Sequence, residues 1–275
     1  MNNNYDDEYT RNPYEDQVQN TTSLNGNIIH MNGESDVFDA TRNGNGYNGG
    51  YGSAYGIDRD EILSKAVTRS FIVMFAALLV SLVTAIYTLN YMSVSFIANS
   101  IMPLCIAEIV VVLIATSAAA KKKVALAGTL FLIYAILNGI TLSVIALVYT
   151  SASIVTMFLV TALMFGGMAF IGLFKQFDFL SVGSYLIMGL WGIIIASIVN
   201  LFLHSSAIET LICYVGVAVF LGLTAYDVQK IKKNAYESDG SSASINSIAL
   251  LGGINLYLDF INLLLKLLRL FGKKR

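Results

Sequence analysis

The stretch NLYLDFINLLLKLLRL, residues 255–270, decides the fold class, because it is a helix of lipid-compatible residues with an aspartate at its centre. Its polar members are separated by steps of four, three and four residues: Asn255, Asp259, Asn262 and Lys266. That spacing places them on one side of an α-helix, which we call the polar stripe. A charged side chain inside a membrane helix costs at least about 2.5–3.5 kcal/mol on insertion scales. We therefore expect the polar stripe to face other helices or a wet cavity.

The composition of the whole chain is that of a membrane protein. Of its 275 residues, 56% are hydrophobic and 13% are charged, whereas a soluble chain carries about 25% charged residues. Apolar segments near the ~20 residues that a spanning helix needs follow one another from residue 70 onward. We expect seven spans, at residues 70–91, 99–120, 124–149, 153–174, 180–203, 207–231 and 248–270. Strands of a β-barrel would alternate and be about half as long, so the sequence predicts an all-α bundle of seven transmembrane helices.

The amino-terminal segment has a different character. Residues 1–56 are rich in Asn, Gly, Tyr and Asp and show no apolar period, which predicts a disordered acidic tail ahead of a membrane domain at residues 57–275. Ten acidic residues and three arginines give residues 1–60 a net charge of −7, so the remainder carries +6. The tail lacks the apolar region of a signal peptide, and we expect it to remain on the mature protein.

Lysine and arginine indicate the orientation of the spans. They gather before the first span and after the second, fourth and sixth: Lys65, Arg69, Lys121, Lys122, Lys123, Lys175, Lys230, Lys232 and Lys233. The other connections, near residues 92–98, 150–152 and 204–206, contain none. This pattern predicts a multi-pass protein of the cell membrane with a cytoplasmic amino terminus. If the last segment spans, the basic carboxyl-terminal GKKR lies outside the cell, which disagrees with this pattern. A re-entrant last segment would keep GKKR in the cytoplasm. The length of 248–270 nevertheless favours a full span.

The sequence contains few residues that could form a disulfide, a metal site or a cofactor site. Cys105 and Cys213 both lie inside apolar runs and are interpreted as small buried hydrophobes rather than as a disulfide or metal pair. His30 and His204 provide no ligand cluster, which argues against a zinc site. We expect no resident cofactor and no nucleic-acid partner.

Three carboxylates lie inside predicted spans, and each has a structural alternative to a functional role. For Glu108 we favour a single hydrogen-bonded carboxyl in helix packing. Asp227 lies in GLTAYDVQKIKK, where reaching toward the interface or pairing with Lys230 is as plausible as function. For Asp259, an ion pair with Lys266 is the main alternative, and a functional role is favoured over it.

Small and amide residues are expected to serve helix packing. Gly216, Ala218, Gly222 and Ala225 would let another helix approach closely. The glycines of FGGMAFIG (165–172) and GLWG (189–192) are interpreted in the same way. Asn138 and Asn200 are predicted to form hydrogen bonds between helices.

Two aspartates on consecutive membrane helices also fit an intramembrane aspartyl protease, in which a tyrosine precedes the first aspartate as Tyr226 precedes Asp227. In such enzymes the second aspartate follows Gly-x-Gly, and a Pro-Ala-Leu motif follows later. Here the second stretch is LYLD, and the only prolines are Pro13 and Pro103. We therefore do not expect an enzyme.

Two carboxyl-terminal motifs resemble a known family. VGVAVFLGLTAYDVQKI and INLYLDFINLLLKLLRLFG look like the sixth and seventh helices of the Bax inhibitor-1 family, the transmembrane Bax inhibitor motif proteins. NGITLSVI, KQFDF and GLWGIIIASIVNLFL are also similar, so the resemblance covers about residues 65–272.

The resemblance implies seven helices with the last one central and enclosed by the other six, and it makes Asp227 and Asp259 the paired aspartates of the family. It further implies a pH-sensitive calcium leak, as in bacterial family members, or suppression of cell death, as in eukaryotic ones. The bacterial plasma membrane is then the expected location. Bacterial members also place an arginine toward the inner end of the second helix. Here that stretch is ATSAAAKKK, and Lys121 is the nearest cation.

These observations lead to two functional hypotheses. The first is a pH-sensitive cation pathway through the bilayer, for Ca²⁺, gated by Asp227 and Asp259 sharing one proton. Asn255, Asn262, Lys266, Glu108 and Lys121 would line or support it, and the two carboxylates with nearby amide oxygens would form a weak Ca²⁺ site. The second is a non-conducting regulator that binds other membrane proteins, such as a protease or a cell-death effector. A regulator would tolerate loss of the polar stripe.

Overall fold

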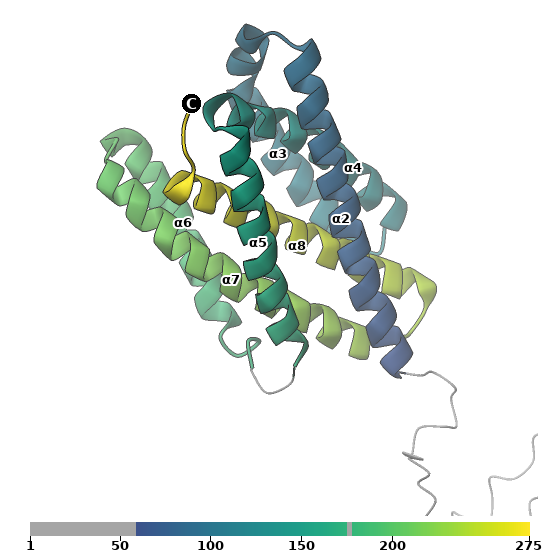
Figure 1. Ribbon diagram of the computed structural model, residues 1–275. Coiled ribbons are helices and arrows are strands. Elements are labelled where there is room, and N and C mark those ends of the chain that lie inside the picture. The colour runs from purple at the N-terminus through teal and green to yellow at the C-terminus, as the bar shows by residue number, and fades with distance from the viewer. Residues whose placement is uncertain (1–58, 175–177) are drawn as a thin grey trace, which may run out of the picture. The chain divides into compact units, whose positions relative to one another are not determined.

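The computed structural model describes residues 59–174 and 178–275. They form seven α-helices: α2 (Arg59–Tyr91), α3 (Val94–Ala120), α4 (Val124–Val148), α5 (Ser151–Leu173), α6 (Gly183–Leu203), α7 (Ser206–Tyr236) and α8 (Ser242–Phe271), drawn in Figure 1. Each contains a segment long and apolar enough to cross a membrane. The predicted all-α bundle of seven spans is therefore confirmed. The predicted tail at residues 1–56 and Lys175 lie outside the described residues.

The helices are longer than the apolar segments that predicted them. α2 begins at Arg59 rather than at residue 70, and the connection of residues 232–247 left between the last two predicted spans shrinks to residues 237–241. Hydropathy detects only the apolar part of a helix, whereas the polar end turns are held by hydrogen bonds. Ser241 caps α8 by accepting from the backbone N–H of Ser244, and Arg59 Nη1 donates to Tyr236 O at 2.6 Å.

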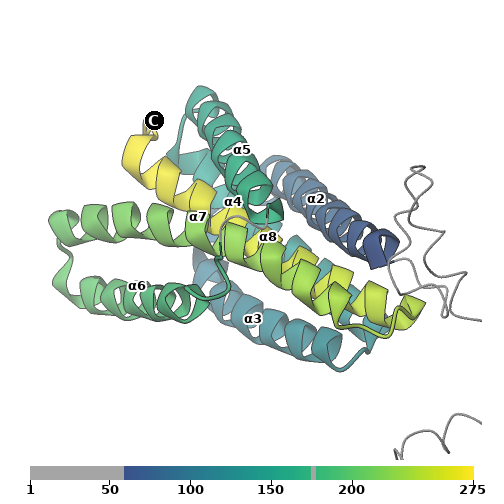
Figure 2. The ribbon, with the colours of Figure 1, turned by 90° about the horizontal axis from the view of Figure 1, so that it is seen from below.

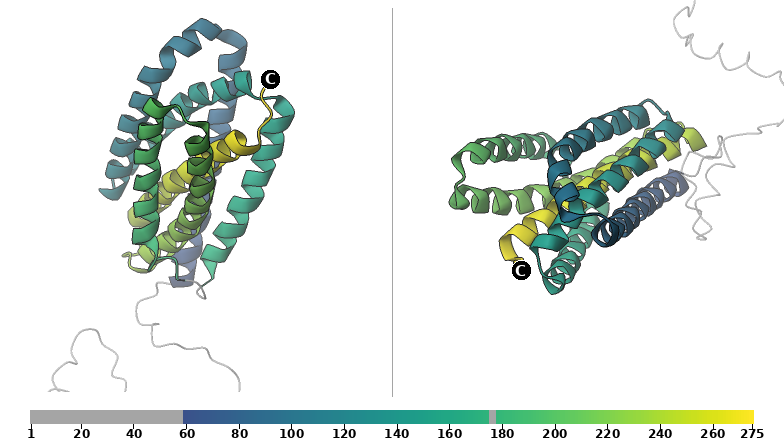
Figure 3. Two further views of the ribbon diagram at one scale, coloured as in Figure 1. Left: turned by 90° about the vertical axis from the view of Figure 1, so that its left-hand side faces the viewer. Right: turned by 90° about the horizontal axis from the view of Figure 1, so that it is seen from above.

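α8 is the central helix of the bundle. It packs most extensively against α2 and α7, and also against α5, α3 and α4. Of its most apolar stretch 67% is buried, against 33% or less in the other six helices. α6 instead packs along α7 at the edge of the bundle, as Figures 2 and 3 show. The enclosure of α8 is therefore less complete on the side of α6 than on the side of α2.

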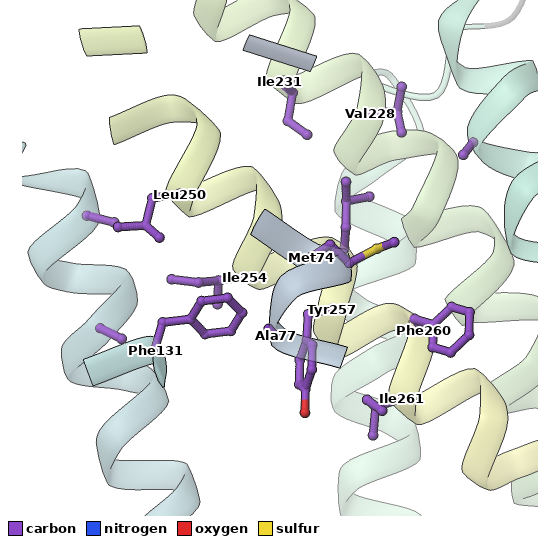
Figure 4. Packing of buried hydrophobic residues seen from close by; sticks show 14 of the residues in the cluster. Met74, Ala77, Phe131, Val228, Ile231, Leu250, Ile254, Tyr257, Phe260 and Ile261 are labelled. Atoms are coloured by element: carbon purple, nitrogen blue, oxygen red, sulfur yellow. The ribbon is translucent and has the colours of Figure 1, made fainter. Parts of the chain in front are cut away.

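The core is built around the middle of α8. Figure 4 shows Tyr257 and Ile254 of α8 among Met74 of α2 and Phe131 of α4. The Tyr257 ring meets the Phe131 ring edge-on, with 5.5 Å between ring centroids. Close packing of this kind is what holds membrane helices together, because lipid tails are as apolar as the side chains themselves.

Two adjacent glycines of α8 bring α2 close to it. A Cβ on Gly252 would lie 2.6 Å from Ile231 Cδ1 of α7 and 2.7 Å from Ser70 Oγ. A Cβ on Gly253 would lie 2.5 Å from Val73 Cγ1 and 3.0 Å from Ser70 O. A side chain at Gly253 would press on the α2 backbone, and one at Gly252 would displace the Ile231 and Ser70 side chains, so the close contact depends on glycine at both positions.

Of the glycines predicted to be packing positions, some are and some are not. A Cβ on Gly172 would lie 2.7 Å from the carbonyl oxygen of Ala225, and one on Gly189 would lie 3.1 Å from Val219 Cγ2. A Cβ on Gly166, Gly167 or Gly192 would meet nothing within 4 Å. The packing interpretation was wrong for those three, because the sequence alone does not say which side of a peripheral helix faces its neighbours.

The small residues of α7 follow the prediction more closely. A Cβ on Gly222 would lie 2.6 Å from Leu186 Cδ2 of α6, and one on Gly216 would lie 3.1 Å from Lys266 Cε of α8. Ala225, which is fully buried, faces α5 at Gly172. α7 is therefore approached closely by three different helices.

The two ends of the bundle are marked by polar contacts. At the end where α2 begins, Lys122 Nζ donates to Ser244 Oγ at 2.6 Å and lies 3.6 Å from Asp239 Oδ2. Hydrogen bonds from Ser244 and Ser241 hold the pKa of Asp239 well below its usual range, so its carboxylate stays charged beside Lys122. We call this the amino-terminal end of the bundle.

The carboxyl terminus lies at the other end. Tyr149, just after α4, forms an isolated antiparallel bridge with Lys274, and the backbone N–H of Thr150 donates to Lys273 O. The last helix therefore spans the bundle, as favoured from its length, and the structure gives no support to the re-entrant alternative. Which end faces the cytoplasm stays a prediction from the lysine pattern.

The placement of the two ends can be tested by cysteine labelling in intact cells. After Cys105 and Cys213 are replaced, a cysteine beside Lys122 is expected to be shielded from an impermeant thiol reagent, and one beside Lys274 is expected to react. Equal reactivity at both sites would contradict the full span of α8, and the reverse pattern would invert the predicted orientation.

The close contact between α2 and α8 predicts an overpacking effect. Gly253→Ala should lower the free energy of unfolding by about 1–3 kcal/mol, because the added methyl must displace Val73 or the α2 backbone. Gly167→Ala is the matched control, since its methyl would meet open space. The measurement is the thermal unfolding midpoint in detergent, and equal midpoints for the two variants would refute the close contact.

Candidate functional site: an aspartate pair beside a cavity

α7 and α8 bring two aspartates together in the interior. The Asp227 side chain lies on α7 and that of Asp259 on α8, and the residues are 7% and 5% exposed. Their carboxyl groups are within reach of a side-chain hydrogen bond. A carboxylate only accepts hydrogen bonds, so such a bond requires that one of the two carry a proton. Asp259 Oδ2 is buried and has no hydrogen-bond partner among the described residues.

The polar stripe supplies the remaining contact to the pair. Asn255 lies one helical turn before Asp259 and donates from Nδ2 to Asp227 Oδ1 at 3.4 Å. Two residues of the stripe, four positions apart on α8, thus converge on one carboxyl group of α7. Asn262 instead donates to Leu258 O of its own helix at 2.8 Å.

Positive charges surround the pair without forming an ion pair with it. Lys230 is the cation close enough to act electrostatically on Asp227, and its Nζ lies 5.5 Å from the centroid of the Tyr226 ring. Within the described ranges, neither Lys230 nor Lys266 lies within ion-pair distance of a carboxylate. The ion pairs of Asp227 with Lys230 and of Asp259 with Lys266, considered from the sequence, are therefore absent from this part of the chain.

Lys121 does not join the site. It is exposed just beyond the end of α3, where its backbone N–H donates to Ser117 O. It also does not line the cavity of about 610 Å³ that lies beside the aspartate pair. The sequence placed it near the pair only by analogy with the arginine of bacterial members.

A cavity of about 610 Å³ lies beside the aspartate pair. One wall is polar and comes from α8 and the end of α7: Asp227, Lys230, Asn255, Asp259, Asn262 and Lys266. The facing wall comes from α6 and is apolar except for Ser197: Ile187, Leu190, Ile193, Ile194, Ser197 and Ile198. All four members of the polar stripe thus line one cavity, as their helical spacing predicted.

The donor set near the pair is small. Among residues 59–174 and 178–275 no group of three or more His, Cys, Asp or Glu side chains is placed to hold a metal ion. Ca²⁺ prefers six to eight oxygen ligands. Two carboxyl groups and nearby amide oxygens therefore suit weak, transient contact with a passing cation better than tight binding.

A second polar cluster lies on the opposite side of α8 and was not expected from the sequence as a unit. The Tyr257 hydroxyl donates to Asn138 Oδ1 of α4 at 3.1 Å and lies 2.7 Å from the Ser81 hydroxyl of α2. Ser81 Oγ also donates to Ala135 O at 2.7 Å. The predicted interhelical role of Asn138 is confirmed. The sequence did not single out Tyr257, because a tyrosine in a membrane helix fits a lipid-facing position equally well.

The cluster continues to α3. Glu108 Oε1 accepts from Thr141 Oγ1 at 2.6 Å, and Glu108 is also hydrogen-bonded by Asn138. The Glu108 carboxyl thus lies in helix packing on a chain of polar contacts that crosses α3, α4, α8 and α2. Asn200, by contrast, accepts from the backbone N–H of Ser205 at the α6–α7 connection, so its predicted interhelical role was wrong.

In the described residues, seven apolar helices, of which α8 is central, together with a buried aspartate pair define a multi-pass α-helical membrane protein. Residues 63–275 match the family model described as Inhibitor of apoptosis-promoting Bax1, and the chain belongs to this Bax inhibitor-1 family.

Several bacterial relatives are similar over most of their length. A protein of Borreliella burgdorferi is 42% identical over 224 residues, which cover 79% of this chain and 97% of that protein. The inner membrane protein YbhL of Escherichia coli K12 is 44% identical over 173 residues, 62% of this chain and 74% of YbhL. A membrane protein of Streptococcus pyogenes is 38% identical over 168 residues, 61% of this chain and 72% of that protein.

The Tyr257 cluster predicts a stability effect that is separate from the aspartates. Tyr257→Phe removes the hydroxyl and leaves buried Asn138 Oδ1 without its donor, so the free energy of unfolding should fall by about 1–3 kcal/mol. Tyr185→Phe is the control, because Tyr185 is 73% exposed. Thermal unfolding in detergent measures the difference, and a Tyr257→Phe midpoint equal to that of the control would show that the hydroxyl is not integral to the packing.

Proposed function

We propose that the protein is a pH-sensitive cation leak pathway, with Ca²⁺ as its cation and the Asp227–Asp259 pair as its gate. The observation that carries the proposal is the placement of both carboxyl groups side by side on the wall of a cavity inside a membrane bundle. A polar wall in hydrocarbon is costly, and such residues commonly mark ion or proton pathways.

The gate would work through one shared proton. With that proton present, the two carboxyl groups are joined by a hydrogen bond and hold α7 against α8. Without it, two unit charges about 4 Å apart repel by about 4 kcal/mol at an effective dielectric of ~20. Loss of the proton would therefore separate the helices and also strengthen the attraction for a cation. A second proton would remove the negative charge altogether.

Weak binding suits a leak. A cation that met a full cage of oxygen ligands would be held rather than passed, because conduction requires sites that release the ion. The pair, the Asn255 amide and the Asn262 amide provide few oxygens within one cavity. Lys230 and Lys266 at its two ends would oppose cation entry and keep the flux low.

The test is Ca²⁺ flux into proteoliposomes over a pH series. Flux is expected to rise as pH rises through the titration of the pair, because deprotonation adds the second negative charge. Asp227→Asn and Asp259→Asn should each flatten this response. The double variant should resemble either single variant, since the pair titrates as a unit.

Insertion and thermal stability of the variants provide the control for misfolding. If both single variants insert normally and keep the full pH response, the pair is structural and the gate hypothesis fails. If the wild-type protein passes no cation at any pH, the alternative of a non-conducting regulator that binds other membrane proteins is favoured.

A further inference from the structure

Two lysines of the described residues line the cavity beside the aspartate pair, and they differ in their surroundings: Lys230 lies over the Tyr226 ring and acts on Asp227, whereas the charge of Lys266 is not balanced by contact. Lys266 is partly buried in the carboxyl-terminal half of α8, and among the described residues its amine has no hydrogen-bond or ion-pair partner. The nearby carboxylate, Glu209, is already engaged with Arg269 Nη1 at 3.3 Å. Asp259 lies seven residues away along α8, about 10 Å at 1.5 Å per residue, which is beyond contact.

The stem of Lys266 is held in place, so its amine has a restricted reach. A Cβ on Gly216 of α7 would lie 3.1–3.3 Å from the Cε, Cδ and Cγ atoms of Lys266. The lysine stem therefore crosses the surface of α7 at a position where only glycine leaves room. This contact places Lys266 along the wall of the cavity rather than in the surrounding lipid.

The opposite wall of the cavity suits an alkyl chain. Ile187, Leu190, Ile194 and Ile198 line it from α6, the helix that packs along α7 at the edge of the bundle. From Asn255 to Lys266 the polar wall extends along α8 for about 16 Å, roughly half of the ~30 Å hydrocarbon thickness. A volume of about 610 Å³ lies in the range of pockets that hold one small ligand, roughly 300–1,000 Å³.

We propose that this cavity binds a single-chain amphiphile with one acidic headgroup, of the long-chain fatty-acid class, taken up from the lipid phase. Its carboxylate pairs with the Lys266 amine, and its alkyl chain lies along the isoleucines and leucine of α6. Hydrocarbon alone would leave the lysine charge without a counter-charge, and water alone would leave the apolar wall exposed. An acidic amphiphile satisfies both walls.

The bound chain would lie across the wall that contains Asp227 and Asp259. It would thereby close the proposed cation pathway, a consequence that rests on the proposed function, whereas the binding itself does not. The two claims are separated by measuring binding without flux.

Binding is tested with the full-length protein in phosphatidylcholine nanodiscs and a palmitic-acid analogue that carries a photoreactive group near the end of its chain. Mass spectrometry should find label on α6, within residues 187–198. Oleate should compete with the label, whereas oleyl alcohol, which has the same chain and no charge, should compete roughly tenfold less well, the loss expected for one charge-assisted contact.

Three variants locate the head and the chain. Lys266→Gln should weaken labelling of α6 roughly tenfold, and Lys266→Arg should retain it, because the positive charge is kept. Ile194→Trp should reduce labelling, because the larger side chain would occupy the cavity beside the apolar wall. This variant keeps the proposal testable if Lys266→Gln fails to fold. Lys65→Gln is the control for loss of a lysine charge outside the cavity, where Lys65 pairs with Glu61.

The proposal is overturned if the label on α6 persists in folded Lys266→Gln and Ile194→Trp, or if oleyl alcohol competes as well as oleate. Competition by phosphatidylglycerol at the level of oleate would replace the single-chain ligand with a two-chain lipid. In proteoliposomes that show Ca²⁺ flux, oleate should reduce flux through the wild type more than through Lys266→Gln. If no Ca²⁺ flux is found, the proposed function is contradicted, whereas the labelling result still decides whether the cavity binds the amphiphile.

Discussion

Asp227 and Asp259 approach each other across the contact between α7 and α8, and no lysine or arginine of residues 59–174 and 178–275 lies within ion-pair distance of either. Two carboxyl groups without a direct counter-ion can stay together in a membrane interior only if they hold a proton between them. The remaining contacts around them are consistent with this constraint. Asn255 donates to Asp227 and adds no net charge, and Lys230 acts from a distance. Under the proposed function, the state of the interior would therefore depend on protonation more than on ion pairing.

The two sides of α8 differ in how firmly they are held. On the side of α2 and α4, Tyr257, Ser81 and Asn138 form a satisfied hydrogen-bond cluster, and Gly252 and Gly253 bring α2 into close contact. On the side of α6, the polar stripe lines a cavity and Asp259 Oδ2 lacks a partner among the described residues. A movement that follows a change in protonation is expected on this second side, because α6 and α7 can shift without breaking the Tyr257 cluster.

The sequence predicted the parts of this arrangement that follow from helical periodicity. Steps of four, three and four residues placed Asn255, Asp259, Asn262 and Lys266 on one wall, and the aspartate pairing followed from the family resemblance. The Tyr257 cluster was not predicted, because it depends on which residues of α2 and α4 lie opposite α8. Gly167 and Gly172 look alike in the sequence, yet only Gly172 touches another helix. Periodicity gives the side of a helix, whereas the neighbour on that side is set by the packing of the whole bundle.

Where bacterial members of the family carry an arginine in the second helix, this chain has small residues that pack closely against α8. In ATSAAAKKK, Ala115, Ala118 and Ala119 are buried, and Ser247 Oγ of α8 donates to Ala119 O at 2.5 Å. Small residues let α8 approach the backbone of α3, and a long arginine side chain at these positions would be hard to accommodate. A neutral hydroxyl-to-carbonyl contact thus joins α3 to α8 at the end of α3 where bacterial members of the family carry the arginine. Since that contact does not titrate, the proposed pH response would leave the attachment of α3 to α8 unchanged and would act at the contact between α7 and α8.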